Sequence, residues 1–252
     1  MRPIEVFYHV FIPADLRAAM WTWWFDQQLG LIKQSKLADV AKVNLAVTMP
    51  KTWGDINGIH FRRDGKGIID ITFEEKVREY INTRYPWVNI INIRDTTDPN
   101  LYEGQTLYHI WERCQTVDID VLYIHSKGVV SASPSVANWR DILNHYCISE
   151  WPRAVKHLDT VDAVGIKDRQ SQEFTFSGNF WWSKSSHIKN LTNPIDTPSY
   201  TTDPSFRPNG PGHRYAFEYW IRTGNPTYTY LVDTKTDHFD EYCFLEDLLL
   251  TV

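Results

Sequence analysis

Cysteine is scarce in this sequence, and its spacing argues against two classes of protein. The 252 residues contain three cysteines, Cys114, Cys147 and Cys243, which are odd in number and form no C-x-x-C pair. A disulfide-stapled domain or a zinc cluster would need paired cysteines at short spacing. We therefore expect a protein of a reducing compartment.

Long apolar runs and single-sign charge runs are also missing. No segment approaches the roughly 20 apolar residues that cross a bilayer, and residues 1–6 lack the apolar stretch of a signal peptide. The net charge is −5, without a Lys/Arg run that would attract nucleic acid. We predict no transmembrane segment, no nucleic-acid partner and a cytoplasmic location.

Strand-like and helix-like segments alternate along the chain instead. β-rich apolar runs fall at residues 4–12, 43–49, 88–93, 121–125, 163–166 and 227–232. Helical periodicity separates them, at residues 15–34, 72–85, 101–114, 136–146, 151–158 and 215–223, whereas 174–182 is apolar and only partly extended. This alternation predicts an α/β fold with a mixed, mostly parallel sheet and helices on both faces, Rossmann-like, in a single domain over 1–252.

One loop at the carboxyl end of a predicted strand stands out. Ligands of such sheets bind beyond the carboxyl ends of the strands, and the strand ending at His125 runs into Ser126, Lys127 and Gly128. Gly128 permits a sharp turn or a close approach to a ligand. Ser126 and Lys127 supply a hydroxyl and a cation for a diphosphate, although a polar loop that happens to hold a lysine is an equal interpretation.

Several strings resemble an uncharacterised group of GT-A-type glycosyltransferases, associated with bacterial polysaccharide clusters and large viruses of algae. They are Tyr123-Ile124-His125-Ser126-Lys127-Gly128, Phe176-Ser177-Gly178-Asn179-Phe180-Trp181-Trp182, Asn138-Trp139-Arg140, Tyr8-His9, Glu103-x-x-Thr106-Leu107 and Glu218-Tyr219-Trp220-Ile221. The resemblance spans most of the chain. It implies a GT-A fold, a nucleotide-sugar donor such as a UDP-sugar, a glycan or glycoprotein acceptor, and for a viral protein the host cytoplasm. Residues 1–130 would bind the nucleotide-sugar and 131–252 the acceptor.

The sequence departs from most GT-A enzymes where they carry an Asp-x-Asp that binds a metal. At the end of this strand it has His125, Ser126 and Lys127. Asp118-Ile119-Asp120 has the right letters but precedes the strand, and five strand residues span about 16 Å. We therefore predict that this acidic pair lies at the wrong end of the sheet for a donor site.

Two hypotheses follow for the donor diphosphate. In the one we slightly prefer, the site is metal-independent and Lys127 neutralises the leaving diphosphate directly. In the other, His125 binds Mn²⁺ or Mg²⁺ with help from His238 or Asp237.

The resemblance also implies roles for a group of polar and aromatic residues. Ser177, Gly178 and Asn179 would line the sugar or acceptor site, with Trp181 or Trp182 stacked on a sugar ring; at least one of the two indoles we expect in the core. His9, Glu103 and Thr106 would contact the donor, although a core histidine and ordinary first-turn helix chemistry explain them equally well.

Glu218 is the candidate general base, with Asp168 in reserve. An inverting transferase needs one carboxylate to take the proton of the acceptor hydroxyl. Arg214 and Arg222 stand at i−4 and i+4 of Glu218, which also fits a plain surface ion-pair ladder.

The predicted function is transfer of a sugar from a nucleotide-diphosphate donor to a glycan hydroxyl, with inversion favoured. The alternative is a GT-A-like protein that has lost catalysis and binds glycan or nucleotide. A nucleotidyltransferase on a similar sheet is a third possibility, but it needs a Gly-rich phosphate loop after the first strand, which residues 11–15 do not provide.

Overall fold

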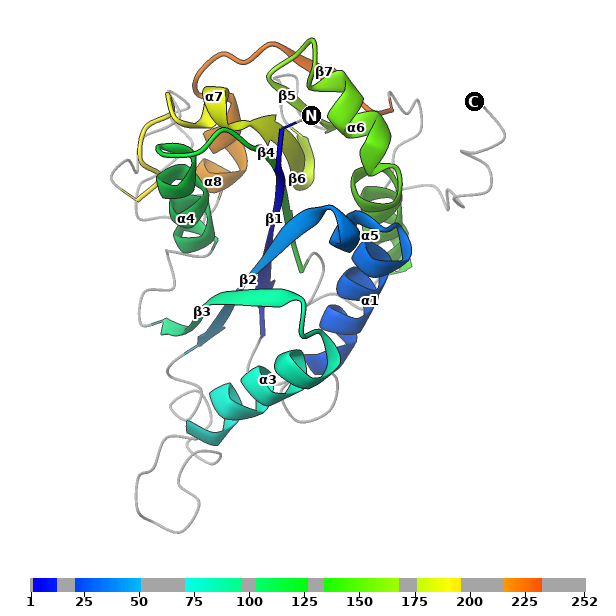
Figure 1. Ribbon diagram of the computed structural model, residues 1–252, viewed down its shortest axis with the longest axis vertical. Helices are drawn as coiled ribbons and strands as arrows, with labels where there is room; N and C mark the ends of the chain where they lie inside the picture. The colour runs from blue at the N-terminus through cyan, green and yellow to red at the C-terminus, as the bar shows by residue number, and fades with distance from the viewer. Residues whose placement is uncertain are drawn as a thin grey trace.

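The computed structural model describes residues 2–12, 21–50, 71–96, 103–126, 134–167, 176–195 and 215–232. Seven strands form one sheet (Figure 1): β1 (Ile4–Phe11), β2 (Ala41–Pro50), β3 (Val88–Thr96), β4 (Asp120–His125), β5 (Ala163–Lys167), β6 (Phe176–Lys184) and β7 (Tyr228–Tyr230). The helices are α1 (Trp21–Gln34), α3 (Ile71–Arg84), α4 (Gly104–Cys114), α5 (Pro134–Asn144), α6 (Trp151–His157), α7 (Ser185–Ile188) and α8 (Tyr215–Tyr219). Short helical turns add η2 (Leu37–Asp39), the π-helical η4 (His145–Ser149) and η5 (Trp220–Arg222).

The sheet is mixed and mostly parallel, as the sequence predicts. Its strand order is β3-β2-β1-β4-β6-β5-β7. Strand β1 pairs in parallel with β2 and β4, β2 with β3, and β5 with β7, whereas β6 runs antiparallel to both β4 and β5. The α/β, Rossmann-like fold class is therefore confirmed.

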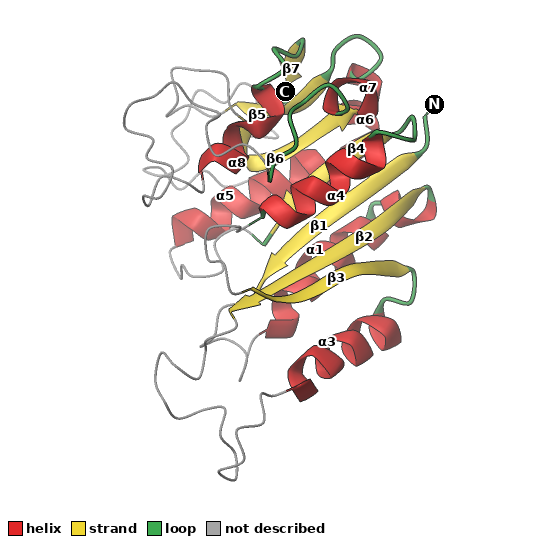
Figure 2. Cartoon of the chain, turned by 90° about the vertical axis from the view of Figure 1, so that its left-hand side faces the viewer, coloured by secondary structure: helices red, strands yellow, loops and turns green. Residues whose placement is uncertain are grey.

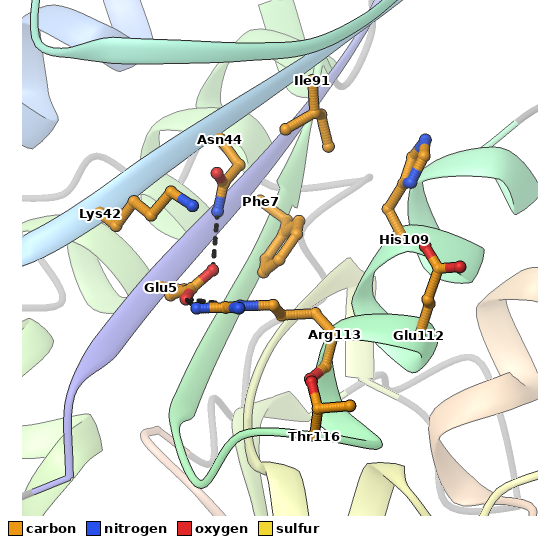
Figure 3. Close-up of a pocket in the computed structure, with 9 residues that line it drawn as sticks. All are labelled: Glu5, Phe7, Lys42, Asn44, Ile91, His109, Glu112, Arg113 and Thr116. Atoms are coloured by element: carbon orange, nitrogen blue, oxygen red, sulfur yellow. Dashed lines mark hydrogen bonds and ion pairs between the residues drawn. The ribbon is translucent and has the colours of Figure 1, made fainter.

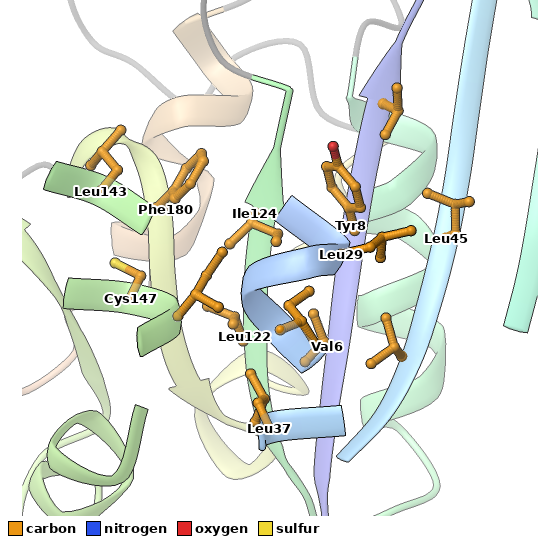
Figure 4. Close-up of a cluster of buried hydrophobic side chains, with 14 of the residues drawn as sticks. Val6, Tyr8, Leu29, Leu37, Leu45, Leu122, Ile124, Leu143, Cys147 and Phe180 are labelled. Atoms are coloured by element: carbon orange, nitrogen blue, oxygen red, sulfur yellow. The ribbon is translucent and has the colours of Figure 1, made fainter. Parts of the chain in front are cut away.

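Helices cover both faces of the sheet and divide the core in two. Helices α1, α3, α5 and α6 pack on one face around β1 residues Val6, Tyr8 and Val10 (Figure 4). Helices α4, α7 and α8 pack on the other face, where Figure 2 shows α4 in front of β1 and β4. The split follows from the two-residue period of the strands, since Phe7 of β1 points to the α4 side and its neighbours to the other.

Local sequence explains several boundaries. Helix α3 ends at Arg84, two residues before Pro86, whose ring cannot continue a helix. Strand β4 reads Asp-Val-Leu-Tyr-Ile-His, and its residues are buried up to the half-buried His125. A strand buried on both faces needs such a nearly continuous apolar run.

One sequence expectation changes and another is confirmed. Residues 176–184, expected to be only partly extended, form a full strand inside the sheet because β4 and β5 pair with it on either side. The rejected acidic pair does lie at the amino end of β4. There Asp120 accepts a hydrogen bond from Arg2 at 2.7 Å, and Asp118 accepts one from Ser185 at 3.1 Å.

Candidate functional site

The strand order places a topological switch point between β1 and β4. From β1 the chain passes through α1 to β2 on one side, and it returns through α4 to β4 on the other. The connecting helices α1 and α4 lie on opposite faces of the sheet. The carboxyl ends of β1 and β4 are therefore the place where ligands bind in sheets of this kind. His9 and His125 are partners in the register of these two strands. The site predicted from the sequence falls at this switch point.

His9 is held neutral beneath helix α4. Its ring is buried, and Nδ1 lies 2.8 Å from the Thr106 hydroxyl in the first turn of α4. Burial lowers the pKa of His9 to about 3, and the positive charge of a protonated His125 would add to the shift. A neutral imidazole keeps one donor and one acceptor nitrogen.

Glu103 is the centre of a buried hydrogen-bond network. It precedes the first residue of α4, and it accepts a hydrogen bond from the Tyr123 hydroxyl at 2.5 Å and one from Asn179 Nδ2 at 2.9 Å. Burial raises the pKa of Tyr123 well above its usual value, and the negative charges of Glu103 and Glu218 raise it further. Tyr123 is therefore a permanent hydrogen-bond donor at neutral pH.

The Ser177-Gly178-Asn179 segment bends the backbone of β6 next to this network. Gly178 and Asn179 both have left-handed φ values, 62° and 56°. Glycine adopts this region readily and asparagine occasionally, whereas most other residues rarely do. A Cβ atom on Gly178 would also lie 2.5 Å from Leu143 Cδ1. His125 Nε2 donates to the Gly178 carbonyl at 2.6 Å, which ties the end of β4 to the bend.

The tryptophans after this segment are core residues. Both Trp181 and Trp182 are fully buried, on opposite faces of the sheet. Trp181 Nε1 donates to Asn179 Oδ1 at 3.0 Å, and Trp182 Nε1 donates to the Cys147 carbonyl at 2.9 Å. Neither ring has a face open for stacking on a sugar, so the stacking role is corrected to a core role for both.

Ser126 links the ends of the two central strands. Its backbone N–H donates to the His9 carbonyl and its Oγ accepts from the Phe11 N–H, each at 2.9 Å. The hydroxyl keeps its own hydrogen for another acceptor. Lys127 and Gly128, like Asp168, Asp237 and His238, lie outside the described residues.

Glu218 lies in α8. Its negative charge raises the pKa of Tyr123, as the smallest of the contributions after burial and Glu103. The neighbouring Phe217 packs so closely on the start of α4 that a Cβ on Gly104 would lie 2.5 Å from the ring. The Arg222 guanidinium lies 4.4 Å from the centre of the Tyr219 ring. Glu218 and Glu103, which are 115 positions apart in the chain, thus both act electrostatically on Tyr123.

Residues 7–226 match the family described as "Domain of unknown function (DUF8361)". The chain belongs to this family. No curated protein matches it. A crystal structure of 4-diphosphocytidyl-2C-methyl-D-erythritol synthase is similar at 11% identity, with 78% of this chain and 83% of that chain covered and a TM-score of 0.34.

Two residues of the candidate site, Tyr123 and Trp139, lie within the quoted sequence strings but receive no individual role from the sequence. The two-residue period of a strand puts Tyr123 on the same face as His125. Trp139 of α5 donates from Nε1 to the Ser177 hydroxyl at 2.8 Å. Such a contact between distant segments leaves no local sequence signal.

The described residues contain no group of three or more His, Cys, Asp or Glu side chains suited to hold a metal ion. None of the helices found there is long and apolar enough to cross a membrane. In the metal-dependent hypothesis His125 has to bind through Nδ1, because Nε2 contacts Gly178.

A separate pocket of about 300 Å³ lies nearer the amino ends of the strands (Figure 3). The buried Glu5 carboxylate forms its floor. It accepts hydrogen bonds from Arg113 at 2.7 and 2.9 Å and from Asn44 at 3.0 Å. Asn44 in turn accepts one from Asn89 at 2.9 Å. The carboxylate is neutralised by a guanidinium from α4, as expected of a structural ion pair.

Proposed function

We propose that this DUF8361 protein is a glycosyltransferase that moves a sugar from a nucleotide-diphosphate donor to a hydroxyl of a glycan or glycoprotein acceptor, with inversion. The observation that supports it most is the polar cluster at the switch point between β1 and β4. There His9, Thr106, Glu103, Tyr123 and Asn179 lie on one face, at the edge where nucleotides bind in doubly wound sheets.

The donor site is built around the ends of β1 and β4. His9 and Thr106 face the nucleoside, and a neutral His9 suits an uncharged base or ribose better than a phosphate. Ser126 and Lys127 hold the diphosphate, with the Gly128 backbone close to it. Lys127 neutralises the charge that develops on the leaving diphosphate. In the competing version, His125 Nδ1 and His238 would hold Mn²⁺ or Mg²⁺, which would supply the neutralising positive charge.

Glu218 is the base in this proposal. The acceptor hydroxyl oxygen forms a bond to the anomeric carbon while the bond from that carbon to the diphosphate oxygen breaks. The hydroxyl proton passes to the Glu218 carboxylate, and the nucleoside diphosphate leaves with the electron pair. General base catalysis of this kind contributes typically about 10²–10⁴-fold in rate. Asp168 is the reserve base.

Glu103 is a positioning residue. It holds Tyr123 and Asn179 through its two carboxylate oxygens. Asn179 has one amide hydrogen bonded to Glu103, and its other one is the group that we assign to a sugar hydroxyl. Gly178 allows the left-handed bend of β6 that precedes Asn179, and Ser177 is fixed by Trp139. In this proposal, residues 1–130 carry the donor site and residues 131–252 the acceptor side.

The test is a thermal-shift screen of UDP- and GDP-sugars against UDP and GDP, with Mn²⁺ and with excess EDTA. A bound donor raises the melting temperature by mass action, by RT ln(1 + [L]/Kd) in free energy. Release of nucleoside diphosphate is then measured for each sugar that binds. Binding with turnover supports the proposal, and loss in EDTA restored by Mn²⁺ selects the metal version. Binding without turnover on any acceptor would select the inactive binding protein, and no binding at all would refute both.

A further inference from the structure

The pocket that contains Glu5, which we call the Glu5 pocket, has a cationic side chain on each of two walls. Lys42 of β2 and Arg113 of α4 extend toward one another across it, and Phe7 and Ile91 add apolar surface to the lining (Figure 3). The volume of the pocket is about 300 Å³. Liquid water takes about 30 Å³ per molecule, and ligand pockets start at about 300 Å³. The pocket therefore has room for a small organic molecule.

Lys42 lacks an ion pair at a position where one would be expected. It stands opposite Glu5 in the parallel register of β1 and β2, and opposite charges at such neighbouring positions attract. The Glu5 oxygens instead accept hydrogen bonds from Arg113 and Asn44. Among the described residues, none forms an ion pair or a side-chain hydrogen bond with Lys42. Because Lys42 is exposed and lines the pocket, its ammonium group is accessible to a ligand.

Arg113 is held in place while part of its guanidinium group stays unused. Its Nε and Nη2 atoms donate to Glu5 Oε1 at 2.9 and 2.7 Å, which fixes the plane of the group. The hydrogens on Nη1 have no partner within the part of the chain that the structure describes. The side chain lines the pocket and is 42% exposed. A planar guanidinium with free N–H groups matches the planar oxygens of a carboxylate.

The two carboxylates of the lining leave the charge of Lys42 unbalanced. Arg113 already neutralises Glu5 at ion-pair distance. Glu112 is exposed on α4, where it accepts a hydrogen bond from the Tyr108 hydroxyl at 3.3 Å and solvent screens its charge. One unbalanced ammonium group suits a ligand with a single negative charge. A doubly charged phosphate would be repelled more strongly by the same two carboxylates.

The apolar part of the lining indicates what the rest of the ligand is. Phe7 and the half-buried Ile91 both line the pocket, from β1 and β3. Covering apolar surface with a hydrocarbon body releases water and is favourable. Small-molecule sites typically combine such apolar walls with a few polar groups that fix the orientation of the ligand. The lining thus fits a compact hydrocarbon body that carries one carboxylate.

We propose that the Glu5 pocket binds a small organic monocarboxylate. The carboxylate lies between Lys42 Nζ and Arg113 Nη1, and the hydrocarbon body lies against Phe7 and Ile91. Glu5 does not touch the ligand; it holds Arg113 in position through its two hydrogen bonds. This site lies nearer the amino ends of the strands and is separate from the switch point, where the proposed donor binds.

The test is nuclear magnetic resonance of the ¹⁵N-labelled full chain, titrated with benzoate, hexanoate, benzamide and inorganic phosphate. Saturable shifts of the Lys42 backbone amide and the Asn44 side-chain amide are expected with benzoate or hexanoate. Benzamide, which has the body of benzoate without its charge, should bind at least about tenfold more weakly.

Substitution of Lys42 tests the same contact from the protein side. Lys42→Gln should weaken binding of the carboxylate at least about tenfold, and Lys42→Arg should restore most of it. Because Lys42 is exposed, both variants should fold. Lys33→Gln is the matched control. It removes an exposed lysine of α1 that pairs with Asp39 at 2.7 Å, and it should leave binding within about twofold of the parent.

Three results would overturn the proposal. The first is the absence of saturable shifts with both carboxylates, which means that water occupies the pocket. The second is equal binding of the carboxylate by the folded Lys42→Gln variant, and the third is equal or stronger binding of benzamide or phosphate. Because no nucleotide-sugar is present in the titration, its failure leaves the proposed transferase activity untouched, and the reverse also holds.

Discussion

Two buried carboxylates lie beneath the same face of the sheet, next to helix α4, and they are satisfied in opposite ways. Glu5, near the amino ends of the strands, accepts two hydrogen bonds from the Arg113 guanidinium. Glu103, at the carboxyl ends, accepts from a phenol and an amide, those of Tyr123 and Asn179. An ion pair cancels charge and fixes helix to sheet, whereas neutral donors orient a carboxylate without cancelling its charge.

The difference separates a structural end of the sheet from a chemical one. At the amino end a guanidinium neutralises the carboxylate of Glu5. At the carboxyl end the negative charges of Glu103 and Glu218 both raise the pKa of Tyr123. His9 at the same end is kept neutral by burial, which lowers its pKa. Perturbed groups gathered at a strand-end crevice are typical of functional sites. Substitutions at one end of the sheet should therefore leave the other end intact.

Gly178→Ala should have the largest effect on stability. The left-handed backbone costs an L-residue about 1–2 kcal/mol, and the forced contact with Leu143 adds about 1–3 kcal/mol. We expect a loss of about 3 kcal/mol in the free energy of unfolding, measured by urea denaturation. Ser183→Ala, which removes the hydrogen bond from Ser183 Oγ to the Asp162 carbonyl at 2.9 Å, should cost about 1 kcal/mol and gives the scale for losing one ordinary buried contact in β6. A loss below about 1 kcal/mol would show that the bend relaxes easily.

Arg113→Met should come next, and it tests the structural end. Removing one partner of a buried ion pair costs about 3–5 kcal/mol. The Arg113 side chain is 42% exposed, so we expect about 2 kcal/mol after solvent screening. Adding Glu5→Gln should recover at least half of this, because the unpaired charge is then gone. Nucleotide-sugar binding should not change in either variant, and a large change would mean that the two ends are coupled.

The pH dependence of stability reports on His9. Its folded pKa, about 3, lies below the unfolded value near 6.5, so the unfolded chain binds the proton first. Stability should therefore be complete above pH 6.5 and fall as the pH drops toward 3. Between pH 7 and 5 this histidine should account for about 2 kcal/mol. His9→Asn should remove that share of the slope of stability against pH. An unchanged slope would mean that His9 takes up its proton in the folded protein as readily as in the unfolded chain.

Gly104→Ala should have the smallest effect on stability and a clear one on the site. The new methyl meets the far end of the Phe217 ring at 2.5 Å, and a side-chain end yields more cheaply than backbone, so about 1 kcal/mol is expected. Glu218 is the next residue, and its displacement should lower turnover of the proposed reaction more than donor binding. Phe217→Leu in the same chain should restore turnover. If turnover stays low in the double variant, the contact does not position Glu218.

The sheet was largely predictable from the sequence, and the side-chain network was not. Alternating strand and helix periods identified β1 and β4, and the rule on strand ends pointed to His125 and Ser126. The two left-handed residues of β6 depend on packing against Leu143 of α5, which no local pattern encodes. The link between Glu103 and Asn179 joins residues 76 positions apart. The resemblance implies a stacking role for Trp181 or Trp182 with at least one indole in the core, whereas the sheet buries both.

The measurement that tests the central claim most directly is the release of nucleoside diphosphate from nucleotide-sugars by the parent and by Glu218→Gln. Asp141→Asn, on the opposite face, serves as the control. The account predicts turnover by the parent and the control, and a loss of about 10²–10⁴-fold in Glu218→Gln with donor binding retained. Near-normal turnover by Glu218→Gln would remove the base, and failure of the parent to bind any nucleotide-sugar would contradict the whole assignment.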